Sequence, residues 1–130
     1  MKYPEPAWRS KYLKVLIIED DPGTLEVTRV CFEIYKPEIT LISASTGRKG
    51  LELIEQENPD AIILDLGLPD IDGNEIIEKV RSTSSVPMLV SSARAESEAI
   101  SKAMQLGASG YIVKPFDPEE LIKTFEKLTG

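Results

Sequence analysis

Five short apolar runs alternate along this chain with segments whose apolar residues repeat at helical spacing. A strand with one wet face alternates apolar and polar residues, whereas these runs are continuously apolar, as expected of strands covered on both faces. We predict these strands at residues 15–18, 39–44, 61–64, 88–90 and 111–113. Strands that alternate with helices in this way indicate a single α/β domain with a three-layer, parallel sheet and right-handed crossovers.

The helices between these runs carry recognisable signals. Val27, Val30, Cys31 and Ile34 recur at i, i+3, i+4 and i+7, a spacing that lines one face of a helix. The Asp21-Pro22 pair is typical of a helix start. We therefore predict the first helix after residue 21, with the Cys31 thiol buried on its apolar face.

Three more helices are predicted at about 47–57, 73–81 and 96–106, and Gly107 is placed to cap the last of these. Gly47 and Gly50 each cost about 1 kcal/mol relative to alanine inside a helix, so intrinsic propensity supports the segment 47–57 least. The final helix follows Asp117 and Pro118, a capping residue and a first-turn proline, and its expected buried stripe is Leu121, Phe125 and Leu128.

Composition narrows the classes of function. The chain has 130 residues, one cysteine, no histidine and a formal net charge of −7. A chain of this length can bury one hydrophobic core but hardly two. Its apolar runs fall far short of the roughly 20 residues that cross a bilayer. Without histidine there is no Ser-His-Asp triad, no histidine-ligated zinc and no phosphohistidine in this chain. The negative charge disfavours direct nucleic-acid binding by this domain.

The first twelve residues carry prolines and a tryptophan without clear periodicity. We expect an N-terminal extension at 1–12 before a domain at 13–130. Its local positive charge fits a partner contact, packing on the domain or a solvated tail, of which the tail is favoured. Because no apolar block follows its charges, this segment does not resemble a secretory signal, and we expect a cytoplasmic protein.

Polar side chains follow the predicted strands at the points where the strands end. Glu19 and Asp20 come after the first strand, Asp65 after the third, Ser92 just beyond the fourth and Lys114 after the fifth. The carboxyl ends of parallel strands share one edge of a sheet, so these groups are expected to converge. Alone, the acids at 19–21 would also suit a helix start.

Three converging carboxylates need a cation, and hard oxygen ligands suit Mg²⁺, which also neutralises charge in phosphoryl transfer. Asp65 is the predicted nucleophile, because carboxylates form aspartyl-phosphate intermediates and a strand end fixes its position. Ser92 could donate to a phosphoryl oxygen, and Lys114 could pair with developing charge.

These residues resemble the receiver domain of two-component response regulators. The resemblance is carried by Glu19-Asp20-Asp21-Pro22, by the segment 65–73 (DLGLPDIDG), by Ser91-Ser92-Ala93-Arg94 and by the segment 110–116 (GYIVKPF), in the expected order over about residues 13–129. It implies a flavodoxin-like (βα)5 doubly wound sheet with strand order 2-1-3-4-5.

The resemblance also assigns roles. Asp65 matches the phosphoacceptor, and it matches the Mg²⁺ site together with Glu19, Asp20 and the backbone carbonyl of Gly67. Ser92 matches the switch hydroxyl and Lys114 the lysine that contacts the phosphoryl group.

Tyr111 matches the aromatic switch, and the Lys114-Pro115 bond matches a cis peptide. The implied mechanism is transfer from a kinase phosphohistidine to the aspartate, after which Ser92 moves toward the phosphoryl group and Tyr111 swings inward. The fourth helix, fifth strand and fifth helix then form the surface that is read.

The implied partners are a sensor histidine kinase or phosphotransfer protein, an output domain or target protein, and a second copy of the phosphorylated chain. The chain is not expected to be an enzyme beyond promoting its own phosphorylation and dephosphorylation. Many receivers fused to winged-helix domains have two acids before the switch tyrosine, where this chain has Ser109 and Gly110, so a dimer built on such acids does not follow.

Other functions fit less well. A haloacid-dehalogenase-like, Mg²⁺-dependent aspartyl-phosphate phosphatase needs a second acid two residues after the nucleophile, where Gly67 stands. A flavin-binding module needs a phosphate-binding loop where this chain has three acids that would repel phosphate. A receiver-like interaction module that is never phosphorylated remains open, and the full set of acids, hydroxyl and lysine argues against it.

Overall fold

A five-stranded parallel sheet in the order β2-β1-β3-β4-β5 organises the chain, as predicted. The computed structural model describes residues 13–129, so the predicted extension at 1–12 lies outside the described residues. The strands are β1 (Lys14–Ile18), β2 (Thr40–Ala44), β3 (Ala61–Leu64), β4 (Met88–Ser92) and β5 (Gly110–Val113). The helices are α1 (Pro22–Tyr35), α2 (Gly47–Glu57), α3 (Gly73–Arg81), α4 (Ser97–Leu106) and α5 (Pro118–Thr129). Among the described residues, no helix has the length and apolar character that a membrane span requires.

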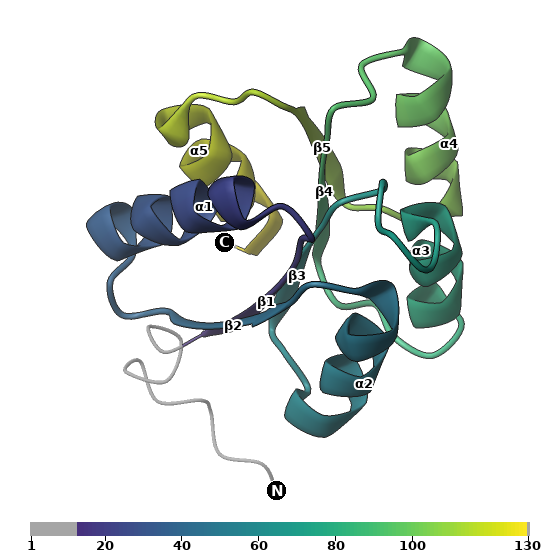
Figure 1. Ribbon diagram of the computed structural model, residues 1–130, viewed down its shortest axis with the longest axis horizontal. Coiled ribbons are helices and arrows are strands. Elements are labelled where there is room, and N and C mark those ends of the chain that lie inside the picture. The colour runs from purple at the N-terminus through teal and green to yellow at the C-terminus, as the bar shows by residue number, and fades with distance from the viewer. Residues whose placement is uncertain (1–12, 130) are drawn as a thin grey trace, which may run out of the picture.

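The helices cover the sheet on both faces, α1 and α5 on one and α2, α3 and α4 on the other (Figure 1). Strand β1 shows why both faces must be apolar. Val15 and Ile17 pack into the core under α1 and α5, while Leu16 and Ile18 pack into the core under α2 to α4. All four are at most 1% exposed, which explains the unbroken apolar run in the sequence.

Helix α2 forms despite its two glycines because Gly50 lets it approach the sheet and Gly47 lets it approach α3. A Cβ at Gly50 would lie 2.5 Å from the Cδ1 atom of Ile18 on β1, far inside contact distance. At Gly47 a Cβ would lie 3.0 Å from the Cδ1 atom of Ile76 on α3. The propensity cost noted for this segment is therefore offset by tertiary packing that only glycine permits.

Helix α1 is placed as predicted, but its apolar stripe is mostly exposed. Cys31 is buried as expected, whereas Val27, Val30 and Ile34 are 51%, 39% and 66% exposed. The sheet instead covers the side of the helix that carries Phe32, whose ring meets Phe125 of α5 edge to face at a centroid distance of 4.9 Å. Helical spacing identified the helix correctly without identifying its buried side.

A guanidinium braces the amino ends of β4 and β5. Arg81, the last residue of α3, donates from Nε to the carbonyl of Gly107 at 2.7 Å and from Nη2 to the Ser109 hydroxyl at 3.3 Å. Ser109 also accepts the Met88 amide at 2.9 Å. Gly107 has φ +118°, which confirms the predicted C-terminal cap of α4.

Candidate functional site

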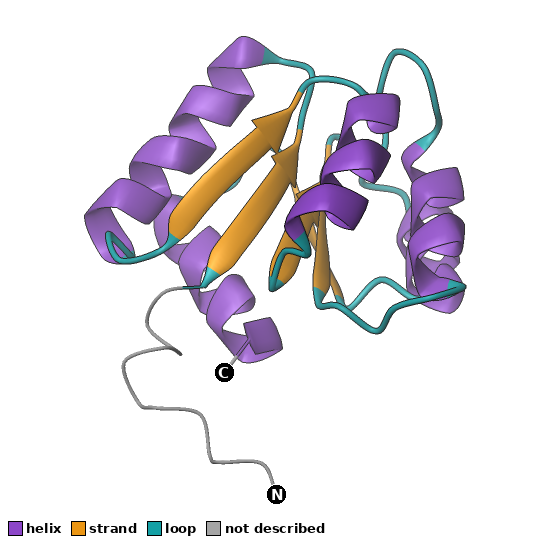
Figure 2. Ribbon diagram, turned by 90° about the horizontal axis from the view of Figure 1, so that it is seen from below, coloured by secondary structure: helices purple, strands orange, loops and turns teal. Residues whose placement is uncertain are grey.

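The sheet register brings the strand-end residues together. Ile18 of β1 pairs with Leu64 of β3, so Glu19 and Asp65 leave adjacent strands at the same level. All strands point toward this edge (Figure 2). The Asp65 amide donates to the Ile18 carbonyl at 3.0 Å, which holds the aspartate backbone against the neighbouring strand.

Three carboxylates meet at this edge. Glu19, Asp20 and Asp65 each offer an oxygen, and these oxygens lie within 4.8 Å of one another. Glu19 is 4% and Asp65 9% exposed, whereas Asp20 faces solvent. Oxygens this close repel one another unless a cation lies among them, and an all-oxygen set with one side open to water has the donor chemistry that Mg²⁺ prefers. These residues therefore fit a divalent cation.

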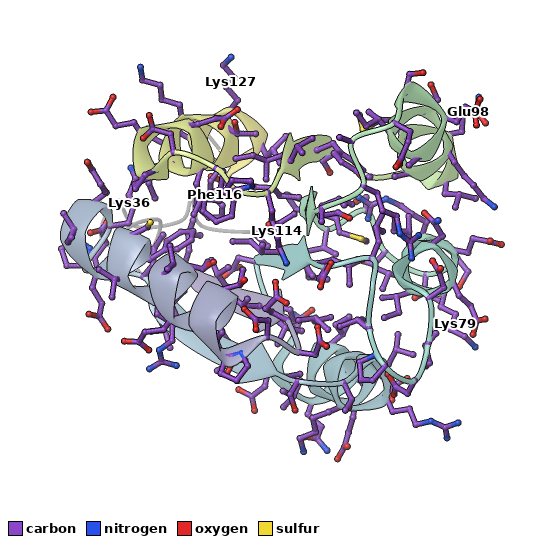
Figure 3. All side chains as sticks on the ribbon, turned by 45° about the horizontal axis from the view of Figure 1, so that its top comes forward. Lys36, Lys79, Glu98, Lys114, Phe116 and Lys127 are labelled. Atoms are coloured by element: carbon purple, nitrogen blue, oxygen red, sulfur yellow. The ribbon has the colours of Figure 1, made fainter. Side chains whose placement is uncertain are left out.

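Lys114 supplies the positive charge of the cluster. Its ammonium hydrogen-bonds to Glu19 and lies 3.5 Å from the Asp65 carboxylate. Lys114 lies centrally in Figure 3, while Lys79 and Lys127 lie at the periphery of the molecule. Its side chain is 17% exposed, so its charge is only partly screened by water.

The electrostatics of Glu19 reflect this crowding. Burial raises the pKa of Glu19 above its ordinary value, and the nearby Asp65 charge acts in the same direction. Hydrogen bonds from Lys114 and from the Asp21 amide lower the pKa of Glu19 and offset part of this effect. The carboxylate is thus held in a site where added positive charge is favourable.

Ser92, Tyr111 and Lys114 are linked through the loop after β4. The Ser92 hydroxyl is 1% exposed and accepts the Arg94 amide at 3.1 Å. The Tyr111 hydroxyl donates to the Arg94 carbonyl at 2.7 Å, and the Lys114 amide donates to the Ser92 carbonyl at 2.8 Å. The Lys114-Pro115 bond is cis. A displacement of Ser92 would therefore also move the loop residue, Arg94, to which the Tyr111 hydroxyl is bonded.

The loop after β3 turns tightly beneath Asp65. The Gly67 amide donates to the Asp65 Oδ1 atom at 3.2 Å, and the Gly73 amide donates to the Leu66 carbonyl at 2.9 Å. Gly73 must be glycine, because a Cβ there would lie 2.5 Å from the Leu66 Cα and 2.8 Å from the Asp65 carbonyl oxygen. The start of α3 is thus packed directly on the backbone of the acidic strand end.

Comparison with known proteins agrees with this geometry. The family model described as the response regulator receiver domain matches residues 15–126. The chain belongs to this family.

Among curated proteins, the receiver domain is 38% identical over 118 residues to the protein named "Probable C4-dicarboxylate response regulator DctR" of Bacillus subtilis, covering 90% of this chain and 52% of that protein. It is 36% identical to the transcriptional regulatory protein KdpE of Staphylococcus aureus, covering 88% of this chain and 50% of that protein. The chain thus spans about half the length of these curated relatives.

Solved structures show the same fold. The Francisella response regulator 1452 receiver domain superposes with a TM-score of 0.83 at 29% identity, over 90% of this chain and 96% of that one. The chemotaxis response regulator CheY4 of Vibrio cholerae gives 0.82 at 28% identity, over 90% and 98%. The flavodoxin-like (βα)5 fold predicted from the sequence is therefore confirmed.

Some residues around the site of this receiver domain were not predicted. Arg94 of the loop after β4 pairs with Asp72 of the loop after β3 at 3.3 Å, and Asp70 binds the amino end of α2. Both contacts join segments distant in sequence, so no local pattern announces them. Ser109, which replaces one of the acids found in many receivers, is used inside the fold by Arg81 and Met88.

Proposed function

We propose that this receiver domain is a switch that accepts a phosphoryl group on Asp65, and that it does so in the cytoplasm. The observation that carries the proposal is the arrangement of Asp65 beside two other carboxylates and 3.5 Å from the Lys114 ammonium, at one edge of the sheet. Family membership supports it independently.

The phosphoryl donor is a phosphohistidine on a sensor kinase or phosphotransfer protein, since this chain has no histidine. A lone pair on an Asp65 oxygen forms the new P–O bond while the P–N bond to the donor imidazole breaks. The electron pair of that bond leaves with the imidazole nitrogen. A largely apolar groove of about 540 Å³, bounded by the first turns of α1, by Ala93 and by residues 114–116, lies beside Lys114 and gives a partner access.

Glu19, Asp20, Asp65 and the carbonyl of Gly67 would hold Mg²⁺, which when bound neutralises charge on the transferring phosphoryl oxygens. Lys114 faces the same oxygens, and its ammonium would leave Glu19 in part to pair with them. The domain promotes its own phosphorylation, and also its own dephosphorylation, by holding these groups in place.

The switch itself is a shift between two arrangements of the loop after β4. A phosphoryl group at Asp65 adds charge and acceptor oxygens, to which Ser92 can donate its hydroxyl hydrogen. Ser92 then moves toward the phosphoryl group and carries the loop with it, and Tyr111, whose hydroxyl contacts this loop, swings inward. The shift in population between the two arrangements then changes the surface formed by α4, β5 and α5.

That surface would act on an output domain or a target protein, and in a homodimer on a second phosphorylated copy. Such a homodimer would use contacts other than a pair of acids before Tyr111, because Ser109 and Gly110 occupy those positions and Ser109 is bonded within the domain. The net charge of −7 disfavours nucleic-acid binding by this domain, so any such contact would belong to a separate domain.

Intact-mass measurement after incubation with Mg²⁺ and acetyl phosphate tests the proposal. The wild-type chain should gain one phosphoryl group, and Asp65→Asn should gain none. Asp60→Asn is a matched control, because Asp60 precedes the same strand at its opposite end. Equal labelling of Asp65→Asn would move the acceptor elsewhere, and an unlabelled wild type would favour an interaction module that works without phosphorylation.

A further inference from the structure

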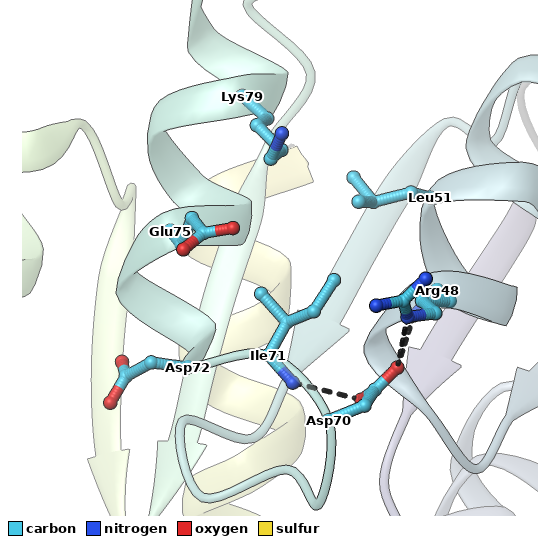
Figure 4. Close-up of a pocket in the computed structure, with 7 residues that line it drawn as sticks. All are labelled: Arg48, Leu51, Asp70, Ile71, Asp72, Glu75 and Lys79. Carbon is cyan, nitrogen blue, oxygen red and sulfur yellow. Dashed lines mark hydrogen bonds and ion pairs between the residues drawn. The ribbon is translucent and has the colours of Figure 1, made fainter.

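The loop after β3 is fastened to α2 by one side chain, Asp70. Its Oδ1 atom accepts the Gly47 amide at 2.8 Å. The same oxygen accepts the Ile71 amide at 3.0 Å, and the Oδ2 atom accepts the Arg48 amide at 2.9 Å (Figure 4). The side chain is 21% exposed, and the Arg48 guanidinium lies 3.9 Å away. No other carboxylate among the described residues accepts three backbone amides in the hydrogen bonds of this structure.

These bonds satisfy groups that α2 cannot satisfy itself. The first N–H groups of a helix have no partner within the helix. The local cap, Thr46, accepts only the Lys49 amide, at 3.1 Å. Asp70 binds the two amides that remain at the start of the helix, and its charge also faces the positive end of the helix dipole. The pKa of Asp70 is lowered accordingly, chiefly by the Arg48 amide.

The packing around this contact leaves little freedom. A Cβ at Gly47 would lie 3.1 Å from the Ile71 Cβ and 3.2 Å from the Asp70 Oδ1 atom, so the helix start rests directly on the loop. The loop is also tied at Gly67 and Gly73 to its own neighbours, Asp65 and Leu66. Asp70 is the residue whose hydrogen bonds connect this loop to helix α2.

The contact between Asp70 and α2 matters because the same loop contains Gly67 and begins beside Asp65. Asp70 follows Gly67, whose carbonyl is assigned to the cation, by three residues, and Asp65 by five. Asp72, the other acid of the loop, pairs with Arg94 at 3.3 Å, and both side chains of this pair are 40% or more exposed. Exposed ion pairs of this kind contribute little stability, so Asp70, whose side chain is less exposed and accepts three backbone amides, is the better anchor.

We propose that Asp70 is a positioning residue for the cation and phosphoryl site: by binding the start of α2 it holds the loop from Gly67 to Asp72 in the conformation that Asp65 and the Gly67 carbonyl need. The proposal rests on the function assigned to Asp65. It predicts that cation binding depends on a side chain that does not touch the cation.

The test compares Asp70→Ala and Asp70→Asn with Asp72→Asn in the full chain. Mg²⁺ affinity is measured by calorimetry, and the Mg²⁺ concentration for half-maximal labelling by acetyl phosphate is measured by intact mass. Asp70→Ala should weaken Mg²⁺ binding about tenfold, as is usual when a group that orients a metal ligand is removed. Asp70→Asn should fall between Asp70→Ala and wild type, because one carbonyl oxygen remains, and Asp72→Asn should stay close to wild type.

Arg81→Ala separates positioning from general stability, because Arg81 braces the opposite edge of the sheet. It should lower resistance to urea and leave Mg²⁺ affinity unchanged. The proposal is overturned if Asp70→Ala binds Mg²⁺ like wild type, or if Arg81→Ala weakens binding equally. A wild type that binds Mg²⁺ without being labelled refutes the function of Asp65 alone, and a wild type that does not bind Mg²⁺ refutes both proposals.

Discussion

Replacement of Gly73 by alanine is the sharpest test of how the end of β3 that carries Asp65 is built. The added Cβ would lie 2.5 Å from the Leu66 Cα and 2.8 Å from the Asp65 carbonyl oxygen, and both neighbours are backbone atoms. A flexible side chain could rotate away from such a contact, but backbone must move as a unit. Relief therefore requires shifting either the start of α3 or the end of β3 that carries Asp65.

The expected loss of unfolding free energy is about 1–3 kcal/mol, the usual cost of forcing extra atoms into a packed site. A matched control exists in Gly23, which also lies in a first helical turn. A Cβ at Gly23 would meet the Asp21 Oδ2 atom at 3.4 Å, an ordinary contact. Gly23→Ala should therefore stabilise the protein by about 0.4–1 kcal/mol through the lower entropy of its unfolded chain.

Urea unfolding of both variants, followed by circular dichroism, measures the two free energies. Acetyl phosphate labelling of Gly73→Ala should also slow, since the strand end that moves carries Asp65, the proposed acceptor. If Gly73→Ala proves as stable as Gly23→Ala, the close approach of α3 to the backbone of Asp65 is wrong. Loss of stability with unchanged labelling would mean that the strain is relieved on the helix side.

Three further predictions concern the core, the surface and pH. Phe125→Ala should lower the unfolding free energy by about 3–5 kcal/mol in urea, because the ring is 2% exposed and packs on Phe32; a loss below 1 kcal/mol would contradict that packing. Ile34→Glu, at 66% exposure, should change it by less than about 0.5 kcal/mol, and a large loss would show that this side of α1 is covered. The pKa of Asp70 is lowered in the folded protein, where Arg48, Asp72, Glu75 and Lys79 lie nearby, so its bonds to α2 stabilise the fold fully above the unfolded pKa of about 3.9. This stabilisation is lost as the pH falls through the folded pKa. The unfolding free energies of wild type and Asp70→Asn in urea should therefore differ at pH 7 and converge in acid, and a difference that stays constant with pH would refute this.

The sequence was sufficient for the order of elements, because β1 to β5 must be apolar on both faces and therefore stand out as unbroken runs. It was also sufficient for the convergence of Glu19, Asp65 and Lys114, which follows from strand direction alone. The buried side of α1 could not be obtained in this way. Val27 and Phe32 are both apolar, and only the position of α5 decides which of them is covered.

Contacts between distant segments were also beyond local patterns. The reason for Gly50 lies in Ile18, more than thirty residues earlier, and the partners of Asp70 lie on α2. Local rules gave only a helix penalty for the glycine and no role for the aspartate. In each case the cause is how closely two elements distant in sequence approach one another, and a local sequence pattern does not contain that distance.

The Arg81 brace joins α3 to the amino ends of β4 and β5, at the edge of the sheet farthest from the acids. Substitutions that raise thermal stability can be sought around it, because this end of the sheet lies away from Glu19, Asp20 and Asp65. Stability and site chemistry can therefore be altered separately, the first through contacts around Arg81 and the second through residues around Asp65.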